Sequence, residues 1–166
     1  TNVHFPTDLN LLWDAQRKCL DGVEALIGRL TGWRKAADWR SKLKGQMRQV
    51  SRICQGGGAK KEERVRAAAR EYLKASYAFE AKVFESLMAL RGQALSVWEL
   101  SQELALDYFH SEVMRHLDLI ERRLLRGERI PHGEKLFSLI EPHTEWIAKG
   151  KLFPPVELGH RLLVAT

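Results

Sequence analysis

The side chains with the clearest potential for metal chemistry lie between residues 103 and 110. Asp107 and His110 are three residues apart, and Glu103 precedes Asp107 by about one helical turn, so a helix would place all three on one side. A di-metal site in a helical bundle needs a second acid-x-x-His pair on a partner helix. The other segments that we predict to be helical contain no histidine, so packing is the favoured interpretation. Likewise, the Glu112 and His116 spacing serves equally well as a surface ion pair.

A second group of ionisable side chains lies in the short segment 141–146. His143 is chemically suited to act as a general base near neutral pH, and Glu141 and Glu145 flank it. The sequence places no nucleophile beside them. A loop whose side chains cap backbone groups is the simpler interpretation of this segment.

The cysteine and tryptophan residues give weaker signals. Cys19 and Cys54 are too few for a disulfide framework and lack the spacing of a zinc site, so we expect small buried apolar side chains and a reducing, cytoplasmic environment. No glycine-rich nucleotide-binding motif is present. Three tryptophans are expected to pack between helices, whereas two at element ends remain open to base stacking. The first set is Trp13, Trp39 and Trp98, and the second is Trp33 and Trp146.

Charge is unevenly distributed along the 166 residues. The stretch 29–74 carries fourteen basic and four acidic residues, a local net charge of +10 in a chain whose overall net charge is +6. Polyanions select for such a block, because each Lys or Arg placed at a phosphate releases condensed counterions. A merely solvated helix face would show the same composition, so charge alone leaves both interpretations open.

Four long segments have the apolar spacing of amphipathic helices, at about 8–30, 35–55, 60–90 and 96–127. Pro6-Thr7-Asp8 signals the first start, the glycines at 56–58 separate the second from the third, and Ser96 with Glu99 forms a capping box. In the fourth segment we expect Leu104, Tyr108, Leu117, Ile120 and Leu124 to point inward. Short connections between four such helices predict a mainly α fold built on an antiparallel four-helix bundle over residues 7–127.

After Gly127 the helical spacing of apolar residues ends. Short apolar runs at 136–140 and 156–165 are separated by proline and glycine, which predicts strands and loops over residues 128–166. The last run stops without a turn signal, and residues 1–6 resemble the end of another strand. We therefore expect both ends to be cuts through a sheet into which the helical bundle is inserted or to which it is attached.

Two stretches resemble the DDE transposases of bacterial insertion sequences, which are enzymes of DNA transposition and recombination in mobile elements. The resemblance covers about a third of the chain, at both ends, and its middle matches only as a helical insertion. The matching residues are T-N-V-H-F-P-T-D at 1–8 with L-L-W-D at 11–14, then I-P-H at 130–132, F-S at 137–138, E-P-H-T-E-W-I at 141–147, K-G-K at 149–151 and P-V-E-L-G at 155–159.

This resemblance implies a ribonuclease-H-like α/β sheet that holds three carboxylates and two divalent ions, Mg²⁺ or Mn²⁺, for in-line phosphoryl transfer. It also implies that the first carboxylate precedes Thr1 and that the other two follow Thr166, so the chain would be an internal fragment without catalytic residues, without a metal or other cofactor of its own, and inactive alone. Asp8 and Asp14 match family positions other than the metal ligands. The motif residues Glu141, His143, Glu145, Trp146 and Glu157 have no assigned role.

The basic block and the resemblance together predict contacts with DNA, either a transposon end or the target. The candidate binding residues are Arg34, Lys35, Arg40, Lys42, Lys44, Arg48, Arg52, Lys149 and Lys151. The alternative is a helical interaction module that mediates homo-oligomerisation without binding DNA. No apolar run approaches the ~20 residues that span a bilayer, so no membrane partner is expected.

Overall fold

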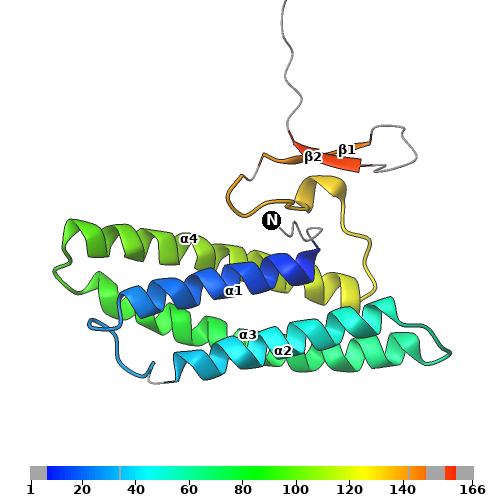
Figure 1. Ribbon diagram of the computed structural model, residues 1–166, viewed down its shortest axis with the longest axis horizontal. Coiled ribbons are helices and arrows are strands. Elements are labelled where there is room, and N and C mark those ends of the chain that lie inside the picture. The colour runs from blue at the N-terminus through cyan, green and yellow to red at the C-terminus, as the bar shows by residue number, and fades with distance from the viewer. Residues whose placement is uncertain (1–6, 34, 142, 149–155, 160–166) are drawn as a thin grey trace, which may run out of the picture.

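The computed structural model describes residues 7–33, 35–141, 143–148 and 156–159 (Figure 1). Its elements are α1 (Asp8–Ala25), α2 (Ala36–Gln55), α3 (Lys61–Arg91), α4 (Val97–Ile120), a π-helical turn (Glu121–Leu125), a 3-10 turn (His132–Glu134), β1 (Glu145–Ala148) and β2 (Val156–Gly159). The four predicted helices are confirmed. The first ends at Ala25, earlier than predicted, and hydrogen-bonded turns continue the chain to Leu30.

Capping hydrogen bonds mark the predicted starts of α1 and α4. The Thr7 hydroxyl accepts a bond from the Asn10 amide (3.3 Å) at the start of α1. The capping box at α4 is complete, since the Ser96 amide donates to the Glu99 carboxylate (2.8 Å) and the Glu99 amide donates to the Ser96 hydroxyl (3.3 Å). Each of these bonds satisfies an amide that has no partner inside the helix, and so fixes where the helix begins.

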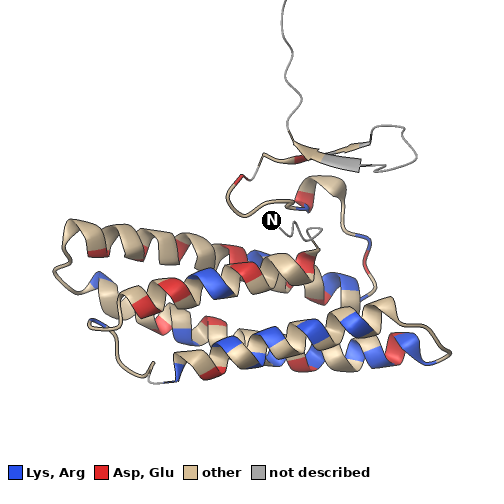
Figure 2. Ribbon diagram, in the orientation of Figure 1, with Lys and Arg blue, Asp and Glu red and all other residues tan. Residues whose placement is uncertain are grey.

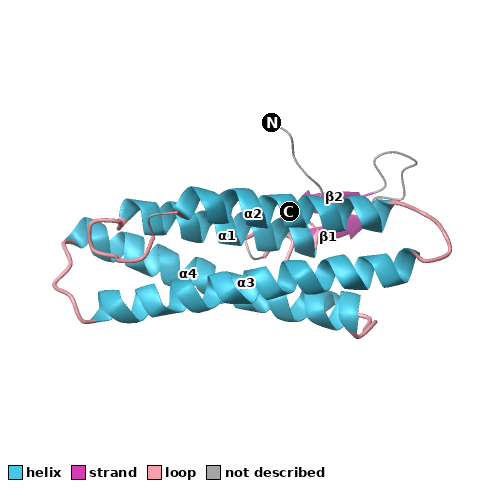
Figure 3. Ribbon diagram, turned by 90° about the horizontal axis from the view of Figure 1, so that it is seen from below, coloured by secondary structure: helices cyan, strands magenta, loops and turns pink. Residues whose placement is uncertain are grey.

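The four helices form an antiparallel bundle in which each helix packs against its neighbours in sequence and α4 closes the ring against α1. Viewed from below, α1 and α2 lie in one layer and α3 and α4 in the other (Figure 3). This arrangement confirms the predicted bundle. No helix in the described part of the chain combines the length and apolar character that crossing a bilayer requires.

Aromatic side chains fill the core where α2 and α3 meet the α1–α2 connection. Phe79 is fully buried, with the rings of Trp33 and Trp39 centred 6.1 and 5.7 Å away. The Trp33 indole donates to the Ser86 hydroxyl (2.8 Å), so this tryptophan, left open by the sequence, is a core residue. Deeper along the bundle, buried Tyr72 donates its hydroxyl proton to the Gln16 side-chain oxygen (3.1 Å).

The inward face of α4 differs from the prediction. Leu104 and Tyr108 were expected in the core, but they are 61% and 40% exposed. Trp98, expected to pack between helices, is 57% exposed. Leu117 and Ile120 are buried as predicted, and the same side of α4 also carries Leu106, His110 and Val113. The prediction failed because apolar residues follow two sides of this helix, and only packing determines which side is buried.

The segment after the bundle is irregular until β1. Residues 136–140, predicted as a strand, form none: Leu136 and Leu139 are buried against the core, and the Tyr108 hydroxyl donates to the Leu139 carbonyl (2.7 Å). β1 and β2 pair antiparallel, with Glu145 opposite Gly159 and Ala148 opposite Val156. This two-stranded ribbon is all the sheet that the described residues contain, and the expected strand at residues 1–6 lies outside them.

Candidate nucleic-acid interface

The candidate interface is a line of basic side chains along α2. Lys44, Arg48 and Arg52 are spaced by four residues, so they lie about 6 Å apart along one side of the helix. The opposite side buries Ala36, Leu43, Met47 and Val50 in the bundle. This amphipathic pattern is why the helix must present its charges outward. We call Lys44, Arg48 and Arg52 the α2 basic line.

All three side chains of the α2 basic line are exposed, and none is paired with a carboxylate among the residues that the structure describes. Figure 2 shows the resulting succession of basic residues along α2. Unpaired cations on a rigid helix keep their full charge available to an external anion. The arrangement suits the repeated phosphates of a nucleic-acid backbone, which are contacted one by one.

Arg40 continues the same line but is engaged within the protein. Its guanidinium bonds to Asp21 and Glu24 of α1, each at 3.0 Å. Burial alone would lower the pKa of Arg40, yet the bonds to these two carboxylates keep it above its ordinary value. These bonds fasten α2 to α1, and DNA binding by Arg40 stays a prediction.

The contacts on either side of α2 show which way the α2 basic line faces. Arg40, on the line, bonds to α1, whereas Gln46, on the other side of α2, donates to the Glu71 carbonyl of α3 (3.4 Å). The line therefore lies toward α1 and away from the layer of α3 and α4.

The remaining predicted binding residues divide into two groups. Lys35 precedes α2 and is exposed, and Lys42 lies off the line, with its ammonium 5.4 Å from the Trp39 ring centre. This cation–π contact holds Lys42 against the protein surface without neutralising it. Arg34, Lys149 and Lys151 lie outside the described residues.

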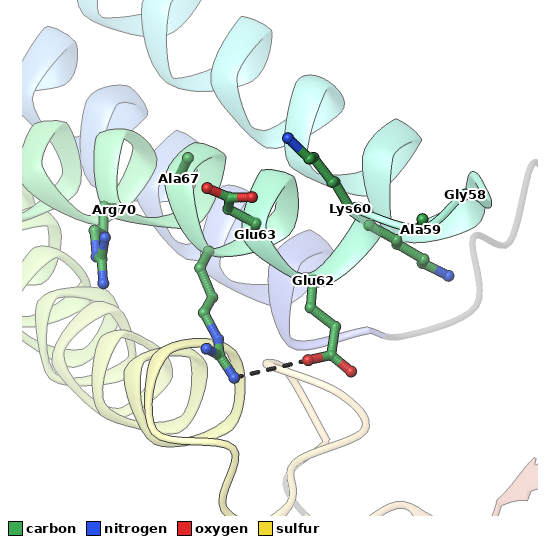
Figure 4. Close-up of a pocket in the computed structure, with 9 residues that line it drawn as sticks. Gly58, Ala59, Lys60, Glu62, Glu63, Ala67 and Arg70 are labelled. Atoms are coloured by element: carbon green, nitrogen blue, oxygen red, sulfur yellow. Dashed lines mark ion pairs between the residues drawn. The ribbon is translucent and has the colours of Figure 1, made fainter.

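A second basic surface, which was not among the predicted binding residues, lies at the start of α3. A hollow of about 690 Å³ runs along it, and its lining includes Lys60, Lys61 and Arg70 (Figure 4). Glu62 and Arg66, one turn apart on α3, also line it and pair with each other (3.8 Å). Most of the positive charge counted between residues 29 and 74 is thus divided between α2 and α3.

Two of the segments on which the predicted resemblance rests lie side by side as a short ribbon. Part of E-P-H-T-E-W-I lies in β1 and part of P-V-E-L-G forms β2, and in their pairing Trp146 is opposite Leu158 and Ile147 is opposite Glu157. A cavity of about 400 Å³ separates this ribbon from α1 and α4, and Asp14, Glu141 and Thr144 are among its lining residues. His143 and Glu145 are exposed.

Asp8 and Asp14, which belong to the stretches with the predicted resemblance, are both engaged in ion pairs. Asp8 contacts Arg123 at 2.9 Å, and Asp14 lies 3.7 Å from Arg17. Asp8 also occupies the first turn of α1, where an acid complements the helix dipole. Both carboxylates therefore have an arginine of the same chain as an ion-pair partner.

The α4 residues His110 and Asp107, considered above for a metal site, contact other side chains of the bundle. His110 Nε2 lies 2.8 Å from Glu80 Oε1, and the ring stacks on Phe84 at 6.0 Å. Asp107, its expected companion in a metal site, instead pairs with Arg91 at 3.3 Å. Within the described residues, no three His, Cys, Asp or Glu side chains gather where they could hold one metal ion.

The chain was compared with known protein families, curated proteins and solved structures. No protein-family model, curated protein or solved structure matches this chain. What the chain binds must therefore be argued from its own residues.

Proposed function

We propose that this chain is the helical, DNA-gripping part of an insertion-sequence DDE transposase, and that the α2 basic line contacts the DNA backbone. The observation that carries the DNA contact is the presence of three exposed, unpaired cations in line on a rigid helix. The transposase assignment rests on the motif resemblance at the two ends of the chain. DNA cleavage and strand transfer would belong to the intact protein, with Mg²⁺ or Mn²⁺ held by carboxylates elsewhere in it.

Contacts of this kind position a duplex without reading its sequence. Each phosphate contact contributes about −0.9 to the slope of log K against log salt concentration, so the three side chains contribute about −2.7. Affinity should therefore fall steeply with salt and differ little between duplexes of equal length. Lys35 and Lys42 would add smaller contributions at the edge of the line.

The test is a fluorescence-anisotropy titration of a labelled duplex at several salt concentrations. The variant Lys44→Gln/Arg48→Gln/Arg52→Gln should bind more weakly, and its salt slope should be flatter by about 2.7. A matched control, Arg91→Gln/Arg115→Gln/Arg126→Gln, removes the same net charge from arginines that already bond within the protein. The control should keep the wild-type slope. An affinity for DNA that does not change with salt concentration would refute the proposed interface. Equal losses of DNA affinity in both variants would also refute it.

The transposase assignment also predicts that the isolated chain does not cleave DNA. Supercoiled plasmid incubated with pure protein and Mg²⁺ or Mn²⁺ should remain intact. Metal-dependent nicking that disappears in Asp8→Asn or Asp14→Asn would show that this chain carries catalytic carboxylates of its own, contrary to the proposal.

The competing function is an interaction module whose charges only solvate it. In that case the Lys44→Gln/Arg48→Gln/Arg52→Gln variant would behave like wild type in every DNA assay. One observation favours an interaction surface as well as DNA binding: large apolar side chains are exposed on α3 and α4, in the layer that does not carry the α2 basic line.

A further inference from the structure

One arginine of α2 continues the α2 basic line but is held by carboxylates of α1. Arg40 precedes Lys44 by four residues, the same step that separates the three members of the line. The side chain of Arg40 is 30% exposed, and those of Asp21 and Glu24 are 44% and 47% exposed. Both ion pairs therefore lie at the surface, within reach of an external phosphate.

The bonds of Arg40 leave part of its guanidinium unused. Nη2 donates to Asp21 Oδ1 and to Glu24 Oε2, each at 3.0 Å, whereas Nε and Nη1 have no partner among the described residues. Neighbouring N–H groups of a guanidinium are the donors that bind a phosphate. Donors for a phosphate are thus present in Arg40, and the charges around them decide whether they are used.

The charges around Arg40 oppose a phosphate. Asp21 also lies 3.9 Å from Arg17, which contacts Asp14 at 3.7 Å. We call Asp14, Arg17, Asp21, Glu24 and Arg40 the α1 border; it contains three carboxylates and two guanidinium groups, so its net charge is negative. A phosphate at Arg40 would lie much closer to both carboxylates than the Debye length of about 10 Å at 0.1 M salt, so their repulsion would be little screened.

The α2 basic line has no such border. Lys44, Arg48 and Arg52 are exposed, and none of them contacts a carboxylate among the described residues. The local charge thus changes from net negative at Arg40 to positive at Lys44 over about 6 Å of α2. Figure 2 shows the acidic residues along α1 and the basic residues along α2.

We propose that Asp21 and Glu24 withhold Arg40 from DNA, so that the line of phosphate contacts begins at Lys44. The two acids determine the footprint without touching DNA: they decide which cations of α2 meet the phosphates, and they keep the duplex from extending over α1. Arg40 becomes a DNA contact only when its carboxylates are neutralised. This inference rests on the proposed contact between the α2 basic line and DNA.

The consequence is measurable in the salt dependence of DNA binding. With both acids neutralised, Arg40 becomes a fourth contact, which adds about −0.9 to the slope of log K against log salt concentration. Raising the salt concentration from about 50 to about 200 mM should then weaken binding by about 3.5-fold more than in wild type. Affinity at the lower salt concentration should also increase, because two negative charges beside the DNA are removed.

The test is the fluorescence-anisotropy titration of a labelled duplex with the variant Asp21→Asn/Glu24→Gln. Amide side chains keep the shape of the acids and still accept hydrogen bonds from Arg40, so the contact between α1 and α2 is retained, as circular dichroism can verify. The variant should bind more tightly than wild type, with a slope steeper by about 0.9. Adding Arg40→Gln to this variant should remove the extra slope.

A matched control, Asp118→Asn/Glu128→Gln, removes two carboxylates from another arginine. Arg122 keeps its bond to Glu134 (2.5 Å), so the control changes the net charge of the chain equally without leaving that arginine unpaired. Its slope should equal that of wild type. The single variants Asp21→Asn and Glu24→Gln disturb the fold least, and each should steepen the slope by less than about 0.9.

The outcomes separate this inference from the proposed function. A wild-type slope in Asp21→Asn/Glu24→Gln and in both single variants would overturn the inference alone, provided that Lys44→Gln/Arg48→Gln/Arg52→Gln still weakens binding. A steeper slope that persists after Arg40→Gln is added, or that appears equally in the control, would also overturn it. Wild-type binding that does not depend on salt or on the α2 basic line would overturn both.

Discussion

His116 provides a quantitative test of the packing at the centre of the fold. Its side chain is fully buried in α4, and neither ring nitrogen has a hydrogen-bond partner within the described residues. The nearest carboxylate, Glu112 Oε2, lies 3.8 Å from His116 Nε2, too far for a hydrogen bond. Burial lowers the pKa of His116 to about 4; the charge of Asp8 opposes this effect and that of Arg115 adds to it. The imidazole is therefore neutral at physiological pH.

The sign of the pH effect follows from this lowered pKa. The pKa of His116 is 6.5 in the unfolded chain and about 4 in the folded one. Between these pH values the unfolded state binds a proton that the folded state does not bind. Stability is thus complete above about pH 6.5 and declines as the pH falls toward 4. Below about pH 4, a pKa lowered from 6.5 to about 4 reduces the free energy of unfolding by about 3 kcal/mol in total. About 2 kcal/mol of this loss is already present at pH 5.

The perturbation is His116→Leu, which removes the titrating group and both unpaired nitrogens while keeping an apolar side chain in the core. We expect urea unfolding, followed by circular dichroism, to show that wild type loses about 2 kcal/mol more than the variant between about pH 7.5 and pH 5. The other histidines and the carboxylates titrate in both proteins, so the difference isolates His116. Glu112 acts in the opposite direction, because burial raises its pKa and acid relieves the cost of its charge.

The result that would refute this reasoning is an equal loss of stability in the two proteins. It would mean that His116 is solvated or hydrogen-bonded in the folded state, and hence that α4 is packed differently from the structure. The measurement therefore checks the orientation of the helix whose inward face the sequence predicted only in part.

Two further predictions concern stability at neutral pH. Phe79→Ala should lower the free energy of unfolding by about 3–5 kcal/mol in urea denaturation, because it leaves a cavity between Trp33 and Trp39; a loss below 1 kcal/mol would contradict this packing. Ser96→Ala should cost about 1 kcal/mol by removing one bond of the α4 capping box, and Ser101→Ala, at an exposed position of the same helix, serves as the control; equal effects would exclude a specific cap.

The helices could largely be predicted because their signals are local. The Ser96 and Glu99 capping box and the three glycines at 56–58 operate within a few residues of the chain, and the structure has both helix boundaries where the sequence indicates. The end of α1 was less predictable. Apolar residues continue to Leu30, but there the chain forms turns and not a helix, with Leu26 and Leu30 buried and Ile27 exposed.

The candidate interface could be predicted only in part. The four-residue spacing of Lys44, Arg48 and Arg52 is visible in the sequence and needs only a helix to place them in line. The different role of Arg40 is not visible, because it depends on Asp21 and Glu24 of another helix. A charge count treats all four residues alike, whereas tertiary contacts decide which cations remain unpaired.

The sequence by itself determined the number of helices, their starting points and the basic side of α2, since periodicity and capping are properties of neighbouring residues. Tertiary structure alone decided which of the two apolar sides of α4 faces the core, and so left Leu104 exposed and His116 buried. It also brought the two motif stretches together as β1 and β2. The physical reason is that burial and pairing depend on what lies across a contact, and the residues that meet there are far apart in the chain.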